Sequence, residues 1–491
     1  MPANTPQPIP ADFALEAQKL LGGDGGAALL AAIDSEPTLS ISLNEAKCRC
    51  AGIEIPPTAE RVSWASHGFY LKSRPRFTFD PLMHAGAYYV EEPSSMFVEQ
   101  AFKVAAADIA INRALDLCAA PGGKTLLLRE AMAAGGLLVA NEPIAKRTAV
   151  LAENVAKWGN PGVAVTCNYP QDFAELTEFF DLIAADVPCS GEGMFRKDHA
   201  ARGEWSLAAV ADCAKRQRQI IADSWAALRT GGYLIYSTCT FNREEDEQNV
   251  AWIAENLGAE IVPIPAAANF PEICGDTAGS LPVYHFFPHK ARGEGFFLAL
   301  LRKTAATATT PPPLTFSKRK SASCTPAKPG LYAEWIVNPQ DFSFVNLRGG
   351  ISAIARGDIA GDIIALSDSL NIVSAGVEVC SAAKPAKPNA RRKPGTAPQP
   401  TPSPALAFSR AFCAEAFPTV SLSYSDAIKY LRGEALQLLS TELPRGRVCV
   451  SYHNLPLGFA NNVGSRLNNA YPESWRIRST YAPAEPPKPE F

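Results

Sequence analysis

The chain has 491 residues and a net charge of −3, and 47% of its residues are hydrophobic. This length exceeds one ordinary globular core, so two or three domains are expected, and the apolar content excludes wholesale disorder. The first residues lack the basic-then-apolar pattern of a signal peptide, and no apolar run is long enough to cross a bilayer. We therefore expect a soluble, cytoplasmic protein, in which contacts with nucleic acid would come from local basic patches.

The twelve cysteines are expected to be free thiols, because no export signal points to an oxidising compartment. The only close pair is Cys48 and Cys50, and no second pair follows at the spacing of zinc ligands. We therefore expect no metal site.

Two stretches that are rich in Pro, Ala, Thr and basic residues and lack acidic residues divide the chain, at 304–330 and 381–404. Such composition predicts linkers, which serve either as spacers or as non-specific contacts to RNA phosphates. They leave three blocks, which span 1–303, 331–380 and 405–491.

Short apolar runs alternate with amphipathic stretches of helix length in the centre of the first block. The predicted strands are Ala114–Cys118, Leu137–Asn141, Val163–Cys167, Leu182–Asp186 and Tyr233–Thr238. The predicted helices lie around 124–134, 145–158, 206–229 and 244–257. This alternation is typical of an α/β fold whose parallel sheet is covered on both faces, with ligands beyond the carboxyl ends of the strands.

A glycine turn follows the first predicted strand, in the segment AAPGGKT over 119–125. Glycines let backbone N–H groups approach a ligand, and the helix that follows favours negative charge at its start. Glu142, at the end of the second strand, can accept hydrogen bonds from a ribose diol. The turn is neither a P-loop nor a GxGxxG motif, and alone it could be structural. Together with Glu142, it favours a cofactor of the adenosine type.

Cysteines follow the last two predicted strands. Cys189 comes three residues after Asp186, and Cys239 closes the segment STC over 237–239. Both could be small buried hydrophobic residues, as cysteines often are. Two thiols and a carboxylate at neighbouring strand ends, beside the expected cofactor loop, instead indicate covalent chemistry.

Methylation of cytosine at carbon 5 suits this combination. That carbon is too electron-poor to attack a methyl sulfonium directly. A thiolate that adds to carbon 6 turns the ring into an enamine, and a carboxylic acid near ring N3 assists the addition.

Three segments are similar to the signature motifs of the Nol/Nop/Sun family of RNA cytosine-C5 methyltransferases, and most similar to its RsmF-type branch. They are ALDLCAAPGGKT (114–125), ADVPCSGEGMFRK (185–197) and YSTCTFNREEDEQNV (236–250). Further similarity lies in 74–100, 285–303 and 455–479, whereas 331–380 shows little. The resemblance implies a Rossmann-like core that uses S-adenosyl-L-methionine and acts on RNA, with 16S rRNA of the small ribosomal subunit as the expected substrate and tRNA as the alternative.

The resemblance also implies residue roles. Cys239 matches the nucleophile, Cys189 the cysteine that assists product release, and Asp186 the acid that contacts the cytosine ring and lies near the methionine part of the cofactor. The residues that match the cofactor site are Cys118, Ala119, Ala120, Pro121, Gly122, Gly123, Lys124, Glu142 and Asn168, with Arg147 as a weaker match. Asn168 stands where an Asn-x-Asp group is usual, so it is our choice for the adenine contact.

The resemblance further implies an N-terminal RNA-binding region over 1–100, a methyltransferase core over 101–303, a small domain over 331–380, and a PUA-like RNA-binding domain over 405–491. In the last block, aromatic and basic residues such as Tyr424, Lys429 and Tyr430 could stack nucleotides and hold phosphates, or could be core. No obligate protein partner and no membrane contact are expected. The alternatives are a non-catalytic RNA-binding factor and a DNA cytosine methyltransferase. Intact Cys239, Cys189, Asp186 and glycine turn disfavour the first, and the Thr-Cys motif together with the RNA-binding tail disfavours the second.

Overall fold

The computed structural model describes residues 7–305, 324–381, 400–437 and 443–491. Within these residues, nine strands form the central sheet in the order β10-β11-β8-β7-β4-β5-β6-β15, with β9 paired to β11. Its strands are β4 (Arg113–Asp116), β5 (Leu137–Asn141), β6 (Val163–Thr166), β7 (Phe180–Asp186), β8 (Leu228–Thr238), β9 (Ala259–Val262), β10 (Val283–Phe286), β11 (Phe296–Lys303) and β15 (Ile372–Ala375). The strands from β8 to β6 run parallel, and β11 and β15 pair antiparallel with β8 and β6 at the two sides.

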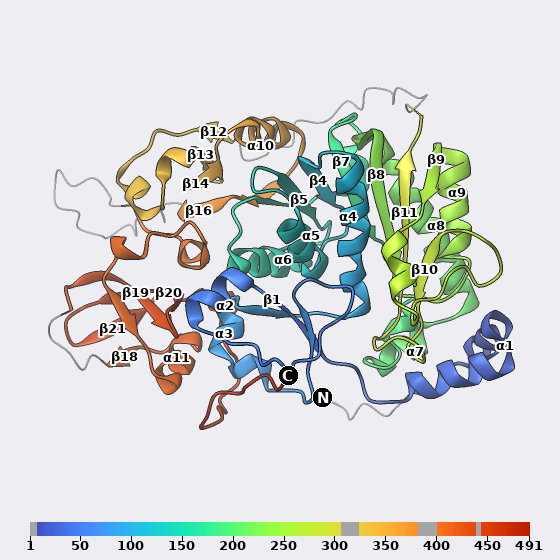
Figure 1. Cartoon of the computed structure of the whole chain (residues 1–491). Helices are drawn as coiled ribbons and strands as arrows, with labels where there is room; N and C mark the ends of the chain where they lie inside the picture. The colour runs from blue at the N-terminus through green and yellow to red at the C-terminus, as the bar shows by residue number, and fades with distance from the viewer. Residues whose placement is uncertain (1–6, 306–323, 382–399, 438–442) are drawn as a thin grey trace.

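Helices cover both faces of this sheet, as Figure 1 shows for the middle of the molecule. Along β7, Ile183 and Ala185 pack into the cluster that holds side chains of α8, α9 and α10, whereas Leu182 and Ala184 pack into the cluster of α4 and α5. The helices are α4 (Val98–Asp108), α5 (Gly123–Ala131), α6 (Ala145–Trp158), α7 (His199–Glu204), α8 (Leu207–Ser224), α9 (Glu247–Leu257) and α10 (Asp358–Ser369). Burial on both faces explains why the central strands are continuous apolar runs. The predicted strand and helix alternation agrees with this order.

The segments at the two ends of the chain share one hydrophobic core. The N-terminal segment contains α1 (Ala11–Ile33), which is kinked at Gly22, α2 (Glu45–Ala51), α3 (Pro81–His84), and the antiparallel strands β1 (Ser40–Leu43), β2 (Gly68–Tyr70) and β3 (Tyr88–Val90). The C-terminal sheet holds β17 (Thr419–Ser421), β18 (Leu436–Gln437), β19 (Gly446–Tyr452), β20 (Leu455–Asn462) and β21 (Arg466–Asn469), beside α11 (Tyr424–Leu431). Ile41 and Leu43 pack in the same cluster as Leu431 and Val448, so the two segments stabilise each other.

Residues 331–380 are tied to the core rather than set apart from it. Here β13 (Phe342–Leu347), β14 (Gly350–Ala355) and β16 (Val377–Cys380) form a four-stranded sheet with β12 (Thr325–Pro326). The strand β15 joins the central sheet, and Ile363 of α10 packs in the central core cluster. A single hydrophobic core therefore includes residues from both sides of the expected boundary between the methyltransferase core and the small domain over 331–380. The pairing of β15 also covers the edge of β6, which would otherwise be unpaired.

Most of the two expected linkers, 306–323 and 382–399, lies outside the described residues. The described remainder is ordered by pairing: Thr325 and Pro326 pair with β13, and Pro402 bridges Cys380. Among the helices that the structure describes, none is long and apolar enough to cross a membrane.

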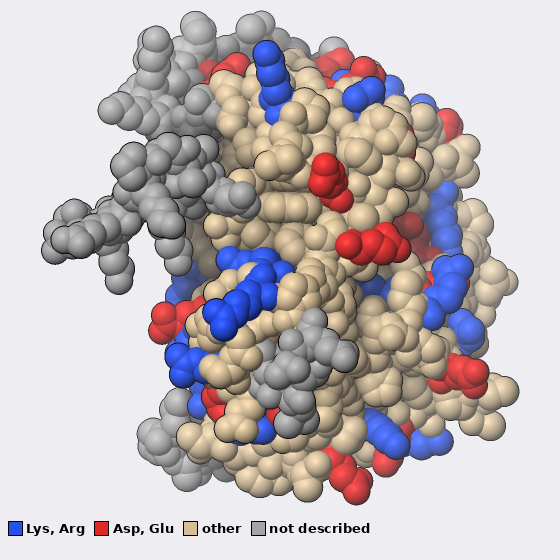
Figure 2. Space-filling view, turned by 90° about the vertical axis from the view of Figure 1, so that its left-hand side faces the viewer, with Lys and Arg blue, Asp and Glu red and all other residues tan. Residues whose placement is uncertain are grey.

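Several aromatic side chains of the C-terminal segment are structural. Tyr430 is 0% exposed, and its hydroxyl donates to the Phe459 carbonyl at 2.9 Å. The Tyr424 hydroxyl donates to the Phe79 carbonyl of the N-terminal segment at 3.2 Å. Tyr430 is therefore a core residue, whereas Tyr424 is half-buried and connects the C-terminal segment to the N-terminal segment. Figure 2 shows lysines, arginines and acidic residues scattered over the face that carries this segment, separated by wide uncharged areas.

Candidate active site

The two cysteines that the sequence singled out lie side by side. Asp186 pairs with Ser237 at the ends of the parallel strands β7 and β8, so the loops that follow begin at the same edge of the sheet. The Sγ atoms of Cys189 and Cys239 are 3.0 Å apart. The hydrogen bond with Cys239, together with burial, raises the pKa of the Cys189 thiol well above its ordinary value. Cys189 therefore keeps its proton and can donate it toward the Cys239 sulfur.

Asp186 lies between the thiols and the glycine turn, and two hydrogen-bond donors hold its carboxylate in place. Its Oδ1 accepts a hydrogen bond from the Ser237 hydroxyl at 2.9 Å, and its Oδ2 accepts one from the Lys124 ammonium at 3.0 Å. Although burial acts to lower the pKa of Lys124, the carboxylates of Asp186 and Glu91 hold it above its usual range. Lys124 is therefore a permanent cation that orients Asp186.

The glycine turn closes a small pocket at the end of β4. The Ala119 N–H donates to the Asn141 carbonyl at 2.8 Å, and Gly122 has a φ of 124°, in the region that favours glycine. The pocket is lined by Tyr89, Val90, Glu91, Asp116, Cys118, Ala119, Ala120, Pro121, Gly123, Lys124 and Asp186. The backbone of the turn and the start of α5 thus face the same space as three carboxylates.

Glu142 and Arg147 connect the end of β5 to this pocket. Glu142 is 1% exposed, and its Oε1 accepts the Ile144 N–H at 3.0 Å. An Arg147 nitrogen lies 3.3 Å from Glu142 Oε2, and another donates to the Ala120 carbonyl at 3.0 Å. Arg147 therefore joins the Glu142 carboxylate to the glycine turn.

The Asn168 side chain, the expected adenine contact, is engaged in hydrogen bonds within the protein. Asn168 is 3% exposed; its Oδ1 accepts the Asn371 N–H at 3.0 Å, and its Nδ2 donates to Asp172 at 3.3 Å. Its amide thus anchors the segment that leads into β15. The neighbouring Tyr169 is 54% exposed, and Ile144, after the end of β5, is 53% exposed.

Sequence reasoning missed Glu91, which comes from the N-terminal segment. Its Oε1 accepts the Ser95 hydroxyl at 2.8 Å, whereas its buried Oε2 has no hydrogen-bond partner among the described residues. A side chain at Gly123 would collide with this carboxylate, so the glycine leaves room for it. Burial raises the pKa of Glu91 to about 7, against the lowering effect of Lys124. The packing of the N-terminal segment on the core brings Glu91 to the pocket. Glu91 lies within the 74–100 stretch that resembles the family, but the resemblance assigned no role to it.

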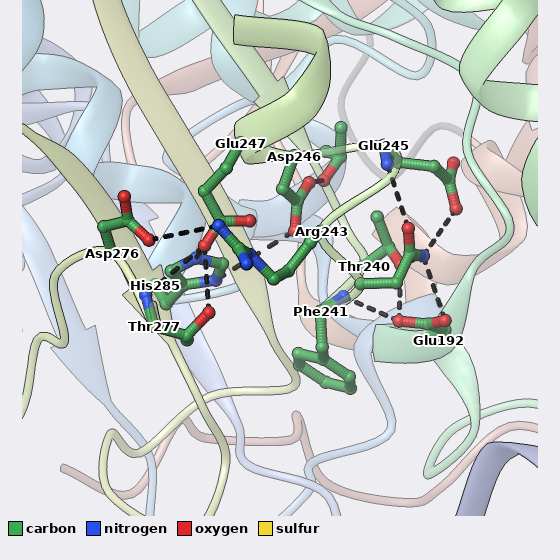
Figure 3. A network of polar contacts seen from close by, with 12 residues as sticks. Glu192, Thr240, Phe241, Arg243, Glu245, Asp246, Glu247, Asp276, Thr277 and His285 are labelled. Atoms are coloured by element: carbon green, nitrogen blue, oxygen red, sulfur yellow. Dashed lines mark hydrogen bonds and ion pairs between the residues drawn. The ribbon is translucent and has the colours of Figure 1, made fainter. Parts of the chain in front are cut away.

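A buried polar network lies behind the Cys239 loop (Figure 3). Thr238, just before Cys239, donates to Asp246 at 2.7 Å, and His285 lies 3.0 Å from Glu247. Burial acts to raise the pKa of Glu247, but the hydrogen bond with His285 lowers it to about 2. The end of β8 is thus anchored to the residue that precedes α9, and the start of α9 is anchored to β10.

The chain matches known proteins over all three parts. Residues 108–302 match the family described as 16S rRNA methyltransferase RsmB/F, residues 9–93 match the N-terminal domain of 16S rRNA methyltransferase RsmF, and residues 417–477 match the methyltransferase RsmF PUA domain.

Two curated relatives carry the same name, ribosomal RNA small subunit methyltransferase F. The protein of Citrobacter koseri is 32% identical over 84% of this chain and 83% of its own length. That of Pectobacterium atrosepticum is 36% identical over 52% of this chain and 53% of its own length. A solved structure of a methyltransferase homolog protein from Pyrococcus horikoshii is 25% identical, with a TM-score of 0.50, over 59% of this chain and 94% of that chain.

The parallel sheet, the glycine turn and the carboxylates at successive strand ends define a Rossmann-like, S-adenosylmethionine-dependent methyltransferase. The chain belongs to the ribosomal RNA small subunit methyltransferase F family. The predicted fold, with its N-terminal segment, methyltransferase core and PUA-like domain, and the predicted family are therefore confirmed.

The residues present fit the cofactor of this family. The pocket carboxylates Glu91, Asp116 and Asp186 match a cationic amino group, and the orphan Oε2 of Glu91 offers it an acceptor. The Gly122–Gly123 turn would let S-adenosylmethionine come close to the backbone N–H groups, and the buried Glu142 could accept hydrogen bonds from a ribose diol.

Proposed function

We propose that the chain methylates carbon 5 of a cytosine in 16S rRNA, with Cys239 as the covalent nucleophile. The observation that carries this proposal is the 3.0 Å contact between Cys189 and Cys239 at the ends of adjacent strands, beside Asp186 and the glycine turn. Bound S-adenosylmethionine supplies an electrophilic methyl group at this edge. Because ribosomal RNA is the substrate, we place the activity in the cytoplasm.

The Cys239 thiolate forms a bond to ring carbon 6, and the displaced ring electrons take a proton at N3 from the Asp186 carboxyl group, which Lys124 and Ser237 orient. N3 returns this proton to Asp186 at elimination. Carbon 5 then becomes nucleophilic and takes the methyl group. The proton on carbon 5 passes to a base, the bond from sulfur to carbon 6 breaks, and Cys239 leaves as a thiolate. The protonated Cys189 lies next to that sulfur and stabilises the departing thiolate through its S–H group.

For the adenosine end of the cofactor, we propose contacts with the ribose from Glu142 and apolar contacts with the adenine from Ile144 and Tyr169. The two apolar side chains follow β5 and β6 and are more than half exposed, whereas the Asn168 amide is already occupied. The cytosine must leave its stack to reach Cys239. We propose that the PUA-like domain and the N-terminal segment hold the surrounding RNA.

The test of this function is the variant Cys189→Ala. With Cys239 intact, addition and methyl transfer continue but elimination stalls, so we expect a covalent protein–RNA adduct that survives a denaturing gel. The double variant that also carries Cys239→Ala should form none. An adduct in the Cys239→Ala single variant would instead assign the nucleophile to Cys189.

The substrate is tested separately. Bisulfite sequencing of 16S rRNA and tRNA from a strain without this gene should show one cytosine in 16S rRNA that loses its modification. A cytosine lost from tRNA alone would move the proposal to the other RNA.

A further inference from the structure

Two buried glutamates connect the loops that carry the catalytic cysteines, and the proposed chemistry does not use either of them. Glu192 lies in the loop after Cys189 and is 2% exposed; Glu245 lies in the loop after Cys239 and is 0% exposed. A carboxylate that is removed from water is costly unless donors surround it. Their surroundings therefore indicate what these two side chains hold.

Glu192 reaches from the Cys189 loop to the Cys239 loop. Its Oε2 accepts the Phe241 N–H at 2.7 Å and the Thr240 hydroxyl at 2.5 Å, and these two residues directly follow Cys239. Its Oε1 accepts the Trp205 indole N–H at 3.0 Å. Figure 3 shows the Glu192 carboxylate facing Thr240 and the Phe241 backbone.

Glu245 makes the opposite connection. Its Oε2 accepts the N–H of Ser190, the residue after Cys189, at 3.0 Å, and the Gln217 amide at 2.6 Å. The amide of Asn242 donates to Glu192 Oε1 at 3.0 Å and to Glu245 Oε1 at 2.8 Å, so it bridges both carboxylates.

We propose that Glu192, Glu245 and Asn242 form a reciprocal clamp that sets the spacing of the Cys189 and Cys239 thiols, so that all three are positioning residues for elimination. Each carboxylate accepts a backbone N–H within two residues of the other loop's cysteine, and hydrogen bonds to charged acceptors are the stronger ones. Two loops held at both ends cannot slide past each other. A displacement of about 1 Å at a reacting group can cost a hundredfold in rate.

The inference rests on the proposed function, because it assigns Cys189 to product release. A clamp that loosens should leave addition by Cys239 possible while Cys189 no longer lies beside the departing sulfur. The expected signature is therefore a slow turnover with trapped RNA and an unchanged affinity for cofactor, which a general loss of folding would not give.

The experiment compares Glu192→Gln, Glu245→Gln and Asn242→Ala with wild type and with Glu244→Gln. Glu244 lies in the same loop and is exposed, so it is the matched control. Each full-length protein is mixed with S-adenosylmethionine and small ribosomal subunits from a strain without this gene. Three quantities are measured: turnover, the fraction of protein in a denaturation-resistant RNA adduct, and the affinity for S-adenosylhomocysteine.

We expect the clamp variants to turn over at least about tenfold more slowly, with more adduct than wild type and an affinity for S-adenosylhomocysteine within about twofold. Glu244→Gln should behave like wild type. In Glu192→Gln, the new amide N–H group would face the Phe241 and Trp205 donors, and this could prevent folding. Asn242→Ala tests the clamp without this problem, because alanine introduces no new donor.

Clamp variants that fold and turn over normally, or that slow down without trapping RNA, overturn the inference. Failure of the proposed function looks different: the wild-type protein itself would transfer no methyl group to the subunits.

Discussion

The carboxyl edge of the central sheet has two halves that differ in the donors around the buried carboxylates nearest the reacting groups. In the thiol half, after β7 and β8, the buried carboxylates Glu192 and Glu245 receive donors from the protein itself on both oxygens. In the cofactor half, at the ends of β4 and β5, the N-terminal segment contributes Glu91, whose Oε2 has no hydrogen-bond partner among the described residues. Burial raises the pKa of Asp116 there to about 7, as it does that of Glu91. Burial also raises the pKa of Glu245 in the thiol half, so the two halves differ in their hydrogen-bond donors rather than in burial.

This difference implies that the thiol half serves the covalent step and the cofactor half serves ligand binding. Internal hydrogen bonds rigidify a constellation before the substrate arrives, which suits a covalent step. Groups with raised pKa values and an open acceptor are stabilised when a ligand brings the missing charge. Changes in the thiol half should therefore affect turnover, and changes in the cofactor half should affect affinity.

The largest effect is expected from Cys239→Ala. We expect methyl transfer to fall by roughly a thousandfold or more, because the proposal assigns the bond to carbon 6 to Cys239 and gives Cys189 a role only in elimination. Affinity for S-adenosylhomocysteine, measured by calorimetry, should stay near that of wild type. A large loss of that affinity would show that the two halves are not separate, and substantial residual methylation would remove Cys239 as nucleophile.

A smaller effect, of the opposite kind, is expected from Glu142→Ala. The buried carboxylate would be lost from the ribose contact, and cofactor binding should weaken by about 1–3 kcal/mol. Single-turnover methylation at saturating cofactor should remain close to wild type. Unchanged affinity for S-adenosylhomocysteine would place the ribose elsewhere.

The pH dependence of cofactor binding sharpens the contrast further. An ionised Glu91 or Asp116 attracts the cofactor's ammonium group, and both are protonated below their pKa values of about 7. Affinity for S-adenosylhomocysteine should therefore fall as the pH drops from about 8 to about 6, by at most about tenfold per pH unit for each proton taken up. Lys124 keeps its charge throughout, since its pKa lies above the usual lysine range.

Glu91→Gln should flatten this dependence and leave the part due to Asp116. The exposed Glu175 supplies the control variant, Glu175→Gln, whose pH profile should match that of wild type. Identical profiles in Glu91→Gln and wild type would exclude Glu91 from the ammonium contact.

The smallest effect is expected from Tyr169→Ala. Removing an exposed aromatic face from the adenine should weaken S-adenosylhomocysteine binding by about 0.5–1.5 kcal/mol, and Tyr169→Phe should restore it. No change in affinity would leave Ile144 as the apolar contact with adenine.

Local sequence patterns were enough to predict the alternating α/β core, the family, and the two strand ends that carry Cys189 and Cys239. These features depend on local signals, because apolar runs set the strands and short motifs close them. Cys239, Asp186 and the glycine turn could thus be found without any knowledge of how the domains pack.

Tertiary structure alone decided the rest. Glu91 reaches the cofactor pocket because the N-terminal segment packs on the core, and Asn168 is occupied because Asn371, far along the chain, lies against it. Glu192 and Glu245 are charged residues in loops, a position that is usually exposed. They are buried because each accepts a backbone N–H from the other cysteine's loop, about fifty residues away in the sequence. Contacts between segments distant in sequence carry no local signature, so only the folded chain shows which carboxylates are held by protein donors and which are open to a ligand.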